Sequence, residues 1–375
     1  MIVVIGAGLI GLSIAYELAR RGATVRVYDA AEPARAASWA GAGMLAPDTE
    51  EIRSAPMHAL CAHSLALFPA YVAQLHRDSG VDARLRLDGI LRLAMTTAEA
   101  EALRAHVAAL CSEGVAARFV SRSEAIALEP ASAGSLAGAA FVEHEGHVDN
   151  RRLGRALRAA CERSGVSIVP RCGAIAVEAD GRRVRGVRTR EGFLAASVVV
   201  NATGASAAVL PGVPDWARVA VHPVKGQMLA LAIPRGLVRR VIWYTGGYAV
   251  PRDDGRLLIG ATVEDAGFDT RVTAAGVRKL LGDALTAMPA LRDVAVSETW
   301  AGLRPGSSDG LPFIGFGALE GYAVASGHYR NGILLAPATA QVLADLIEGR
   351  APAIEASAFS PLRADAKAAA ANRTA

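Results

Sequence analysis

The sequence VVIGAGLIG, from Val3 to Gly11, decides how the rest of the chain is interpreted. The apolar run Ile2 to Ile5 suits a buried parallel strand, and it leads into a GxGxxG motif made by Gly6, Gly8 and Gly11. Without side chains, these positions permit a tight turn, close approach of backbone N–H groups to a pyrophosphate, and close packing of the following helix. The motif therefore predicts a dinucleotide-binding fold.

The residues after the glycines complete a strand–helix–strand unit. A helical pattern places Leu12, Ala15 and Tyr16 on one face and ends at Gly22, and a second strand leads to Asp29. A carboxylate at this position accepts hydrogen bonds from ribose hydroxyls and repels a 2′-phosphate. Both NAD and FAD satisfy this requirement, so the unit alone does not choose between them.

Three later segments favour FAD. The small residues of ASWAGAGMLAP, 37–47, let the main chain press against a flat ring, and NATG, 201–204, ends a buried strand at the cofactor face. The segment Arg330 to Gly332 precedes a helical pattern that ends at Gly349. A helix N-terminus there would stabilise negative charge on a reduced flavin ring.

The remaining pattern indicates an α/β protein of two interleaved domains. We expect a discontinuous, Rossmann-like FAD-binding domain made of residues 1–82, 146–216 and 298–362. Capping boxes at Thr96 and Ser121 and several strand-like runs predict a mixed, strand-rich α+β substrate domain made of residues 83–145 and 217–297. Single strands are expected over Val241–Pro251 and Leu257–Thr262, and residues 363–375 are expected to form a flexible tail.

Composition excludes several classes of function. The formal net charge is only +4, and the basic residues are scattered without interleaved aromatics, so we expect no nucleic-acid partner. Glycine and proline interrupt the uncharged run from Phe193 to Pro214, so we expect no membrane span. The four cysteines form no metal-binding cluster, and no basic residue precedes the apolar N-terminus, so we expect no metal and a cytoplasmic location.

Three longer sequences identify a family resemblance: GAGMLAP at 41–47, WAGLRPGSSDGLPFIG at 300–315 and GHYRNGILLAPAT at 327–339. Through them the chain, from residue 1 to about 350, resembles flavoproteins of the D-amino-acid oxidase superfamily, and within it the glycine oxidases of thiamine biosynthesis. The resemblance implies a fold of the D-amino-acid oxidase type and FAD held without a covalent bond. The FAD contacts that it implies, together with the glycine motif, are Gly6, Gly8, Leu9, Ile10, Gly11, Asp29, Ala30, Ala37, Ser38, Ala42, Gly43, Met44, Ala174, His328, Tyr329, Arg330, Asn331, Gly332, Ile333 and Leu334.

The resemblance also implies a catalytic site. Arg304 would hold the substrate carboxylate, Tyr248 would donate its hydroxyl, and Arg330 would lie close by. This agrees with the chemistry of the residues, because a planar guanidinium pairs with a carboxylate through two hydrogen bonds. Gly246 and Val263 stand where at least one relative has histidine and methionine, so we expect a larger pocket that also admits sarcosine or D-alanine.

The expected reaction is oxidation of a small amino acid by hydride transfer from its α-carbon to flavin N5. The imine would hydrolyse to a 2-oxo acid and ammonia or pass to thiazole synthase, and molecular oxygen would reoxidise the flavin and release hydrogen peroxide. Three alternatives stay open: a quinone-linked D-amino-acid dehydrogenase, a sarcosine oxidase, and a non-catalytic flavin-binding subunit. A homo-oligomer is compatible with the sequence.

Overall fold

The computed structural model describes residues 1–132, 134–173 and 175–363. Of the expected flexible tail only Arg363 is described, and its guanidinium pairs with Asp309 at 2.6 Å. The rest of that tail and Ala174 lie outside the described residues.

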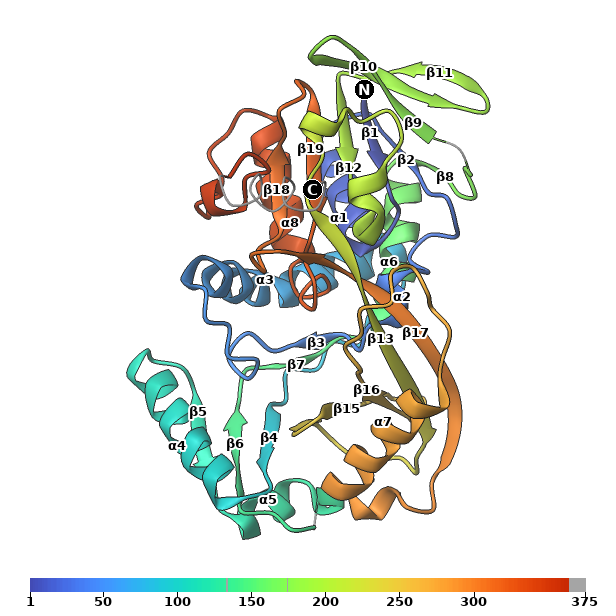
Figure 1. Cartoon of the computed structure of the whole chain (residues 1–375). Helices are drawn as coiled ribbons and strands as arrows, with labels where there is room; N and C mark the ends of the chain where they lie inside the picture. The colour runs from blue at the N-terminus through green and yellow to red at the C-terminus, as the bar shows by residue number, and fades with distance from the viewer. Residues whose placement is uncertain (133, 174, 364–375) are drawn as a thin grey trace.

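A six-stranded sheet forms the upper part of the molecule in Figure 1. Its order is β18 (Phe313–Phe316), β19 (Tyr322–Ser326), β12 (Val198–Asn201), β1 (Ile2–Ile5), β2 (Val25–Tyr28) and β8 (Ser167–Val169). All neighbours pair in parallel except β18 and β19. Segments that lie far apart in the sequence thus pair side by side in this sheet.

Both faces of this sheet are covered, which explains why every residue of β1 is buried and apolar. Ile2 and Val4 pack into a core with the helices α1 (Leu9–Arg20), α3 (Ala55–Ser79), α6 (Asn150–Arg163) and α8 (Ala336–Ile347). Val3 and Ile5 face the other way, onto a three-stranded sheet of β9 (Ile175–Asp180), β10 (Arg183–Thr189) and β11 (Gly192–Ala195). Alternate side chains of one strand thus reach two cores.

An eight-stranded mixed sheet forms the lower part (Figure 1). Its order is β17 (Ala295–Ser307), β13 (Val221–Ala232), β16 (Arg256–Gly260), β15 (Gly247–Pro251), β14 (Val241–Tyr244), β4 (Ile90–Ala94), β6 (Gly138–Val142) and β5 (Ala117–Val120). Helices α4 (Thr97–Ser112), α5 (Arg122–Leu128) and α7 (Ala274–Ala287) belong to this part. The long strands β13 and β17 run from this sheet up to the six-stranded part.

Short elements lie between the two sheets. Helix α2 (Ala37–Ala40) is followed by β3 (Met44–Leu45), which pairs antiparallel with β7 (Gly146–His147). In Figure 1 this small ribbon crosses the middle of the molecule, between the upper and lower parts. The segments that carry GAGMLAP therefore lie where the two parts meet.

Local signals in the sequence predict several elements well. The expected capping boxes at Thr96 and Ser121 are confirmed, and Asp149 caps α6 through the backbone N–H of Arg152. The single strand expected over Val241–Pro251 is wrong, because the chain reverses between β14 and β15 at a turn in which Gly246 has φ +96°. The strand expected to reach Thr262 ends at Gly260. The division of the chain between two domains stays a prediction.

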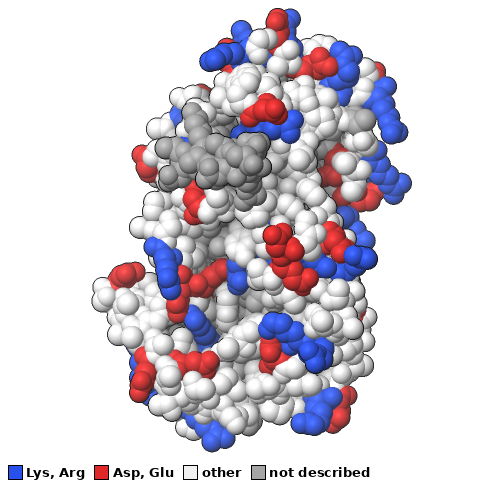
Figure 2. Space-filling view, in the orientation of Figure 1, with Lys and Arg blue, Asp and Glu red and all other residues white. Residues whose placement is uncertain are grey.

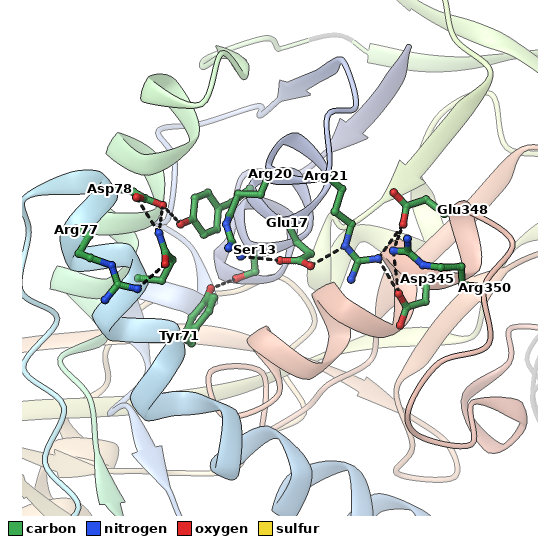
Figure 3. A network of polar contacts seen from close by, with 12 residues as sticks. Ser13, Glu17, Arg20, Arg21, Tyr71, Arg77, Asp78, Asp345, Glu348 and Arg350 are labelled. Atoms are coloured by element: carbon green, nitrogen blue, oxygen red, sulfur yellow. Dashed lines mark hydrogen bonds and ion pairs between the residues drawn. The ribbon is translucent and has the colours of Figure 1, made fainter.

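A polar network ties α1 to its neighbouring helices (Figure 3). Arg21 pairs with Glu17 at 2.7 Å on its own helix, and with Asp345 at 2.6 Å and Glu348 at 2.9 Å at the end of α8. Toward α3, Ser13 shares a hydrogen bond of 2.6 Å with Tyr71. The helix that follows the glycine turn is thus anchored on two sides.

We expect Arg21→Ala to lower the free energy of unfolding by about 1–3 kcal/mol, since the carboxylates of Glu17, Asp345 and Glu348 lose a charged donor. Arg20→Ala is the matched control, because Arg20 is 45% exposed and contacts Glu17 only at 3.4 Å. It should cost at most about 0.5 kcal/mol. Urea unfolding of both variants measures this. If the two variants lose the same free energy of unfolding, the network around Arg21 does not stabilise the protein.

Two surface properties bear on partners. No helix in the described part of the chain is long and apolar enough to cross a bilayer. On the face drawn in Figure 2, basic and acidic side chains are interspersed rather than gathered by sign. This face therefore presents no extended field of one charge.

Candidate active site

One cavity of about 1130 Å³ lies at the junction of the two parts. The six-stranded part contributes the glycine turn, the end of β2 and the segment 325–333, and the lower part contributes residues of β13, β15 and β17. The volume exceeds the range of about 300–1,000 Å³ that is usual for small-ligand pockets. The cavity thus has room for a ligand larger than a single amino acid.

The glycine turn shapes one end of this cavity. Gly6 has φ +106°, and a Cβ there would overlap the carbonyl oxygen of Ala202. A Cβ on Gly11 would overlap the carbonyl oxygen of Gly6. Helix α1 begins at Leu9 without a side-chain cap, so the amides of its first turn lack partners within the helix and carry partial positive charge. This end suits a pyrophosphate.

Asp29, at the end of β2, lines the cavity beside the glycine turn. Its Oδ2 accepts a hydrogen bond from the backbone N–H of Ala7 at 2.6 Å, and its Oδ1 accepts one from Ala31 at 2.8 Å. Burial raises the pKa of this carboxyl group, and the two backbone donors oppose the rise. Each oxygen keeps a further lone pair, so the carboxylate can still accept ribose hydroxyls.

The loop 37–44, in which α2 forms one short turn, presents mostly small residues to the cavity, and its carbonyl groups are held from behind. Asn150 Nδ2 donates to Ser38 O at 2.8 Å, Trp300 Nε1 donates to Ala40 O at 2.9 Å, and Arg252 Nη2 donates to Ala42 O at 2.7 Å. Gly43 has φ +72° and packs against the carbonyl group of Val148, where no side chain fits. The main chain here is a fixed surface, as a flat ring requires.

The segment 328–333 lines the cavity with a turn that precedes α8. His328 is buried, its Nε2 lies 3.0 Å from Thr339 Oγ1, and burial lowers its pKa to about 3. It is therefore neutral at ordinary pH. Helix α8 begins at Ala336, so Arg330–Gly332 precedes a helix as expected, and Tyr329 in the preceding turn has φ +47°. That the N-terminus of this helix faces a flavin ring stays a prediction.

Arg304, on β17, lines the cavity with part of its guanidinium unused. Its Nη1 donates to the carbonyl oxygens of Thr262 at 3.1 Å and Lys225 at 3.3 Å, and the group lies against Gly226, where a side chain would displace it. Among the residues described, no carboxylate lies within 4.0 Å of it. This cation is therefore anchored by backbone and available to an anionic ligand.

Arg330 lines the same cavity, but its charge is already paired. Its Nε lies 2.5 Å from Glu50 Oε1, and its guanidinium lies 5.4 Å from the centre of the Trp243 ring. Burial raises the pKa of Glu50, while Arg330 and then Arg304 oppose that rise. The sequence did not identify Glu50, because the turn DTEE carries no motif; its only signal is a carboxylate just after GAGMLAP.

Tyr248, on β15, reaches the cavity from the lower part. Its ring centre lies 6.0 Å from that of Trp243, and it packs over Gly260. Its hydroxyl lies 4.0 Å from the sulfur of Met228, which is a weak acceptor. The hydroxyl can thus turn toward a stronger acceptor in the cavity.

The structure brings most of the predicted residues to this one cavity. Gly11 and Leu334 do not line it, because Gly11 packs beneath Gly6 and Leu334 is buried in the helical core. Ala174 lies outside the described residues. The predicted residues that line the cavity are Gly6, Gly8, Leu9, Ile10, Asp29, Ala30, Ala37, Ser38, Ala42, Gly43, Met44, Tyr248, Arg304, His328, Tyr329, Arg330, Asn331, Gly332 and Ile333.

The expected enlargement of the pocket at Gly246 and Val263 is wrong. Gly246 lies in the β14–β15 turn, where a Cβ would meet Asp283 of α7, and the side chain of Val263 is 57% exposed. Neither residue lines the cavity. Phe268 and Thr270, from the loop between β16 and α7, line it instead.

The chain is similar to proteins of known family over nearly all its length. The family model DAO, described as FAD dependent oxidoreductase, matches residues 1–346. The glycine oxidase of Geobacillus kaustophilus is 35% identical over 96% of each chain, and that of Pseudomonas aeruginosa is 35% identical over 96% of this chain and 98% of its own. The bifunctional protein ThiO/ThiG of Trichormus variabilis is 37% identical over 92% of this chain and 52% of its own length.

Solved structures agree with this family. The crystal structure of glycine oxidase from Geobacillus kaustophilus superimposes with a TM-score of 0.92 at 35% identity, covering 96% of this chain and 98% of that one. The fold class expected from the sequence is thereby confirmed, and FAD fits both the glycine turn and the backbone surface of the loop 37–44. The chain therefore belongs to the DAO family of FAD-dependent oxidoreductases.

Proposed function

We propose that this enzyme oxidises glycine and similar small amines, such as sarcosine and D-alanine, to imines. One observation carries the proposal: Arg304, without a carboxylate partner among the residues described, faces the cavity that the glycine turn begins. A guanidinium that is anchored by carbonyl groups and open toward a cavity is suited to the carboxylate of an amino acid. The names of the relatives support the same substrate class.

The chain would hold FAD along the whole length of the cavity. The first turn of α1 would bind the pyrophosphate and Asp29 the ribose, while the loop 37–44 and the turn 328–333 would enclose the ring. The bound flavin supplies a hydride acceptor at its N5 atom. These residues would exclude water from one side of the ring and fix its position.

The residues around Arg304 would orient the substrate. Arg304 would pair with the carboxylate, Tyr248 would donate its hydroxyl to the same group, and Arg330 would lie close by. Asp29 lies at the glycine turn and Glu50 is paired with Arg330, so neither carboxylate is placed as a general base. The amine would therefore enter deprotonated, and the chain would contribute orientation and charge complementarity.

The products follow from the chemistry of an imine. Glycine, oxygen and water would give glyoxylate, ammonia and hydrogen peroxide, with the two electrons of the C–H bond passing to oxygen. Relatives that join ThiO to ThiG in one polypeptide support a second fate, in which the imine supplies thiazole synthesis. Thiazole synthase would then be the partner of this enzyme.

A turnover panel tests the substrate and the electron acceptor together. FAD-loaded protein is given glycine, sarcosine, D-alanine or D-proline, and peroxide and oxygen consumption are measured beside reduction of a quinone-like dye. We expect peroxide with glycine, at least equal to that with the larger amines. Dye reduction without oxygen uptake would indicate a dehydrogenase, and preferred turnover of sarcosine would indicate an N-methyl amine oxidase.

A further inference from the structure

A short acidic turn, Asp48 to Glu51, connects the loop 37–44 to helix α3 and carries Glu50. Glu50 is the carboxylate that pairs with Arg330 in the cavity. The position of this turn therefore sets the position of Arg330. What holds the turn lies outside the cavity.

Glu145, in the connection between β6 and β7, holds the turn from below. Its side chain is fully buried, and its Oε1 accepts hydrogen bonds from the backbone N–H groups of Asp48 at 2.5 Å and Thr49 at 3.1 Å. Its Oε2 accepts the hydroxyl of Thr49. Burial raises the pKa of Glu145 to about 7, so this carboxylate is ionised in mildly alkaline solution. Every hydrogen bond that Glu145 makes with the turn comes from a donor, and an ionised carboxylate can accept them all.

Other groups fix the same turn from its sides. The buried carboxylate of Asp48 lies 2.7 Å from His58 Nε2 and 3.0 Å from His144 Nε2. His106, on α4, contributes its Nε2 at 2.9 Å from Asp48 O. Arg92, on β4, donates to Thr49 O at 3.1 Å. The turn is thus fastened mainly to elements of the lower part, with His58 of α3 as the contact from above, whereas Arg330 belongs to a segment of the upper part.

We propose that Glu145 is a positioning residue for substrate binding, acting on Arg330 through Thr49 and Glu50. Thr49 and Glu50 are neighbours in the chain, so a displacement of the Thr49 amide displaces the carboxylate that orients Arg330. The inference rests on the proposed function, in which Arg330 lies beside the substrate carboxylate. Glutamine has nearly the shape of glutamate, but it carries no charge, and its N–H₂ group accepts neither the hydroxyl nor the amide of Thr49 as Oε2 does. Glu145→Gln therefore weakens the hold on the turn while conserving volume.

The test compares binding with turnover in FAD-loaded protein at pH 8. Acetate, which carries a carboxylate but no amine, is titrated while the visible spectrum of the flavin is recorded, and KM and kcat for glycine are measured separately. For Glu145→Gln we expect both the dissociation constant of acetate and KM to rise about tenfold, the scale of a lost hydrogen bond to a charged group. We expect kcat to change by less than about threefold, because the hydride-transfer geometry depends mainly on Arg304 and the flavin.

Two further variants separate positioning from general damage. Thr49→Val removes only the hydroxyl donor to Oε2, so it should weaken acetate binding in the same direction by a smaller factor. Glu129→Gln is the matched control, because Glu129 is also fully buried and accepts backbone N–H bonds from Arg239 at 3.1 Å and Arg240 at 2.8 Å, but the segment that it holds does not line the cavity. It should lower thermal stability without changing acetate affinity.

The outcomes distinguish this inference from the function on which it rests. Wild-type protein that neither binds acetate nor oxidises a small amine would defeat the proposed function, and the role of Glu145 would fall with it. If the wild-type protein does both and Glu145→Gln leaves acetate affinity unchanged, the role of Glu145 is overturned and the proposed function stands. An equal loss of affinity in Glu129→Gln would overturn it as well, since the effect would then be a general one.

Discussion

Replacing Arg304 with alanine is expected to lower kcat/KM for glycine by the equivalent of about 2–5 kcal/mol, mainly through a higher KM. The substrate carboxylate would then enter the cavity without a charged partner. Arg330 cannot replace that partner, because its guanidinium is paired with Glu50 at 2.5 Å. Steady-state kinetics with glycine, using peroxide as the readout, measures the change.

Arg304→Lys separates charge from geometry. Lysine keeps the positive charge, but it cannot make the two parallel hydrogen bonds of a guanidinium, so it should recover only part of the loss. Arg271→Ala controls for removal of any arginine, because Arg271 is 86% exposed and pairs locally with Asp269. If KM stays at the wild-type value in Arg304→Ala, Arg304 is not part of the substrate site.

Gly11→Ala is expected to weaken FAD binding. A Cβ on Gly11 would overlap the carbonyl oxygen of Gly6, which is backbone and cannot rotate away. The helix would have to separate from the glycine turn, and overpacking of this kind costs about 1–3 kcal/mol. The dissociation constant of FAD should therefore rise by about tenfold or more. The ratio of flavin to protein after gel filtration measures this.

Gly282→Ala provides the matched control for that substitution. Gly282 lies within α7, and a Cβ there would meet no atom within 4 Å. Alanine in a helix is favoured over glycine by up to about 1 kcal/mol. This variant should therefore keep its flavin and unfold at a slightly higher temperature. Full flavin content in Gly11→Ala would show that close packing of α1 against the turn is not needed for the cofactor.

The sequence predicted those parts of the fold that depend on neighbouring residues. The glycine motif, the helix caps at Thr96 and Ser121, and the buried strand Ile2–Ile5 are local signals, and the structure has each of them. The break at Gly246 was missed because apolar residues continue on both sides of it, which reads as one strand. The pair Gly246-Gly247 is the local signal that could have placed the turn there.

Side-chain partners across the chain could not be predicted in the same way. The motif around Arg330 indicated a site residue, but its partner Glu50 stands 280 positions earlier in a turn without a motif. The contact of Glu145 with Asp48 likewise joins residues 97 positions apart. Gly246 and Val263 were placed in the pocket by comparison with a relative, whereas packing of the turn and the loop keeps both away from it.

Anaerobic mixing of the FAD-loaded protein with glycine tests the central claim most directly. That claim is that the cavity between the two sheets holds a flavin beside a guanidinium that binds an amino-acid carboxylate. The account predicts that the yellow absorbance of the protein is lost on mixing and returns when oxygen is admitted. A protein that carries FAD but keeps its colour with glycine, sarcosine, D-alanine and D-proline would contradict it.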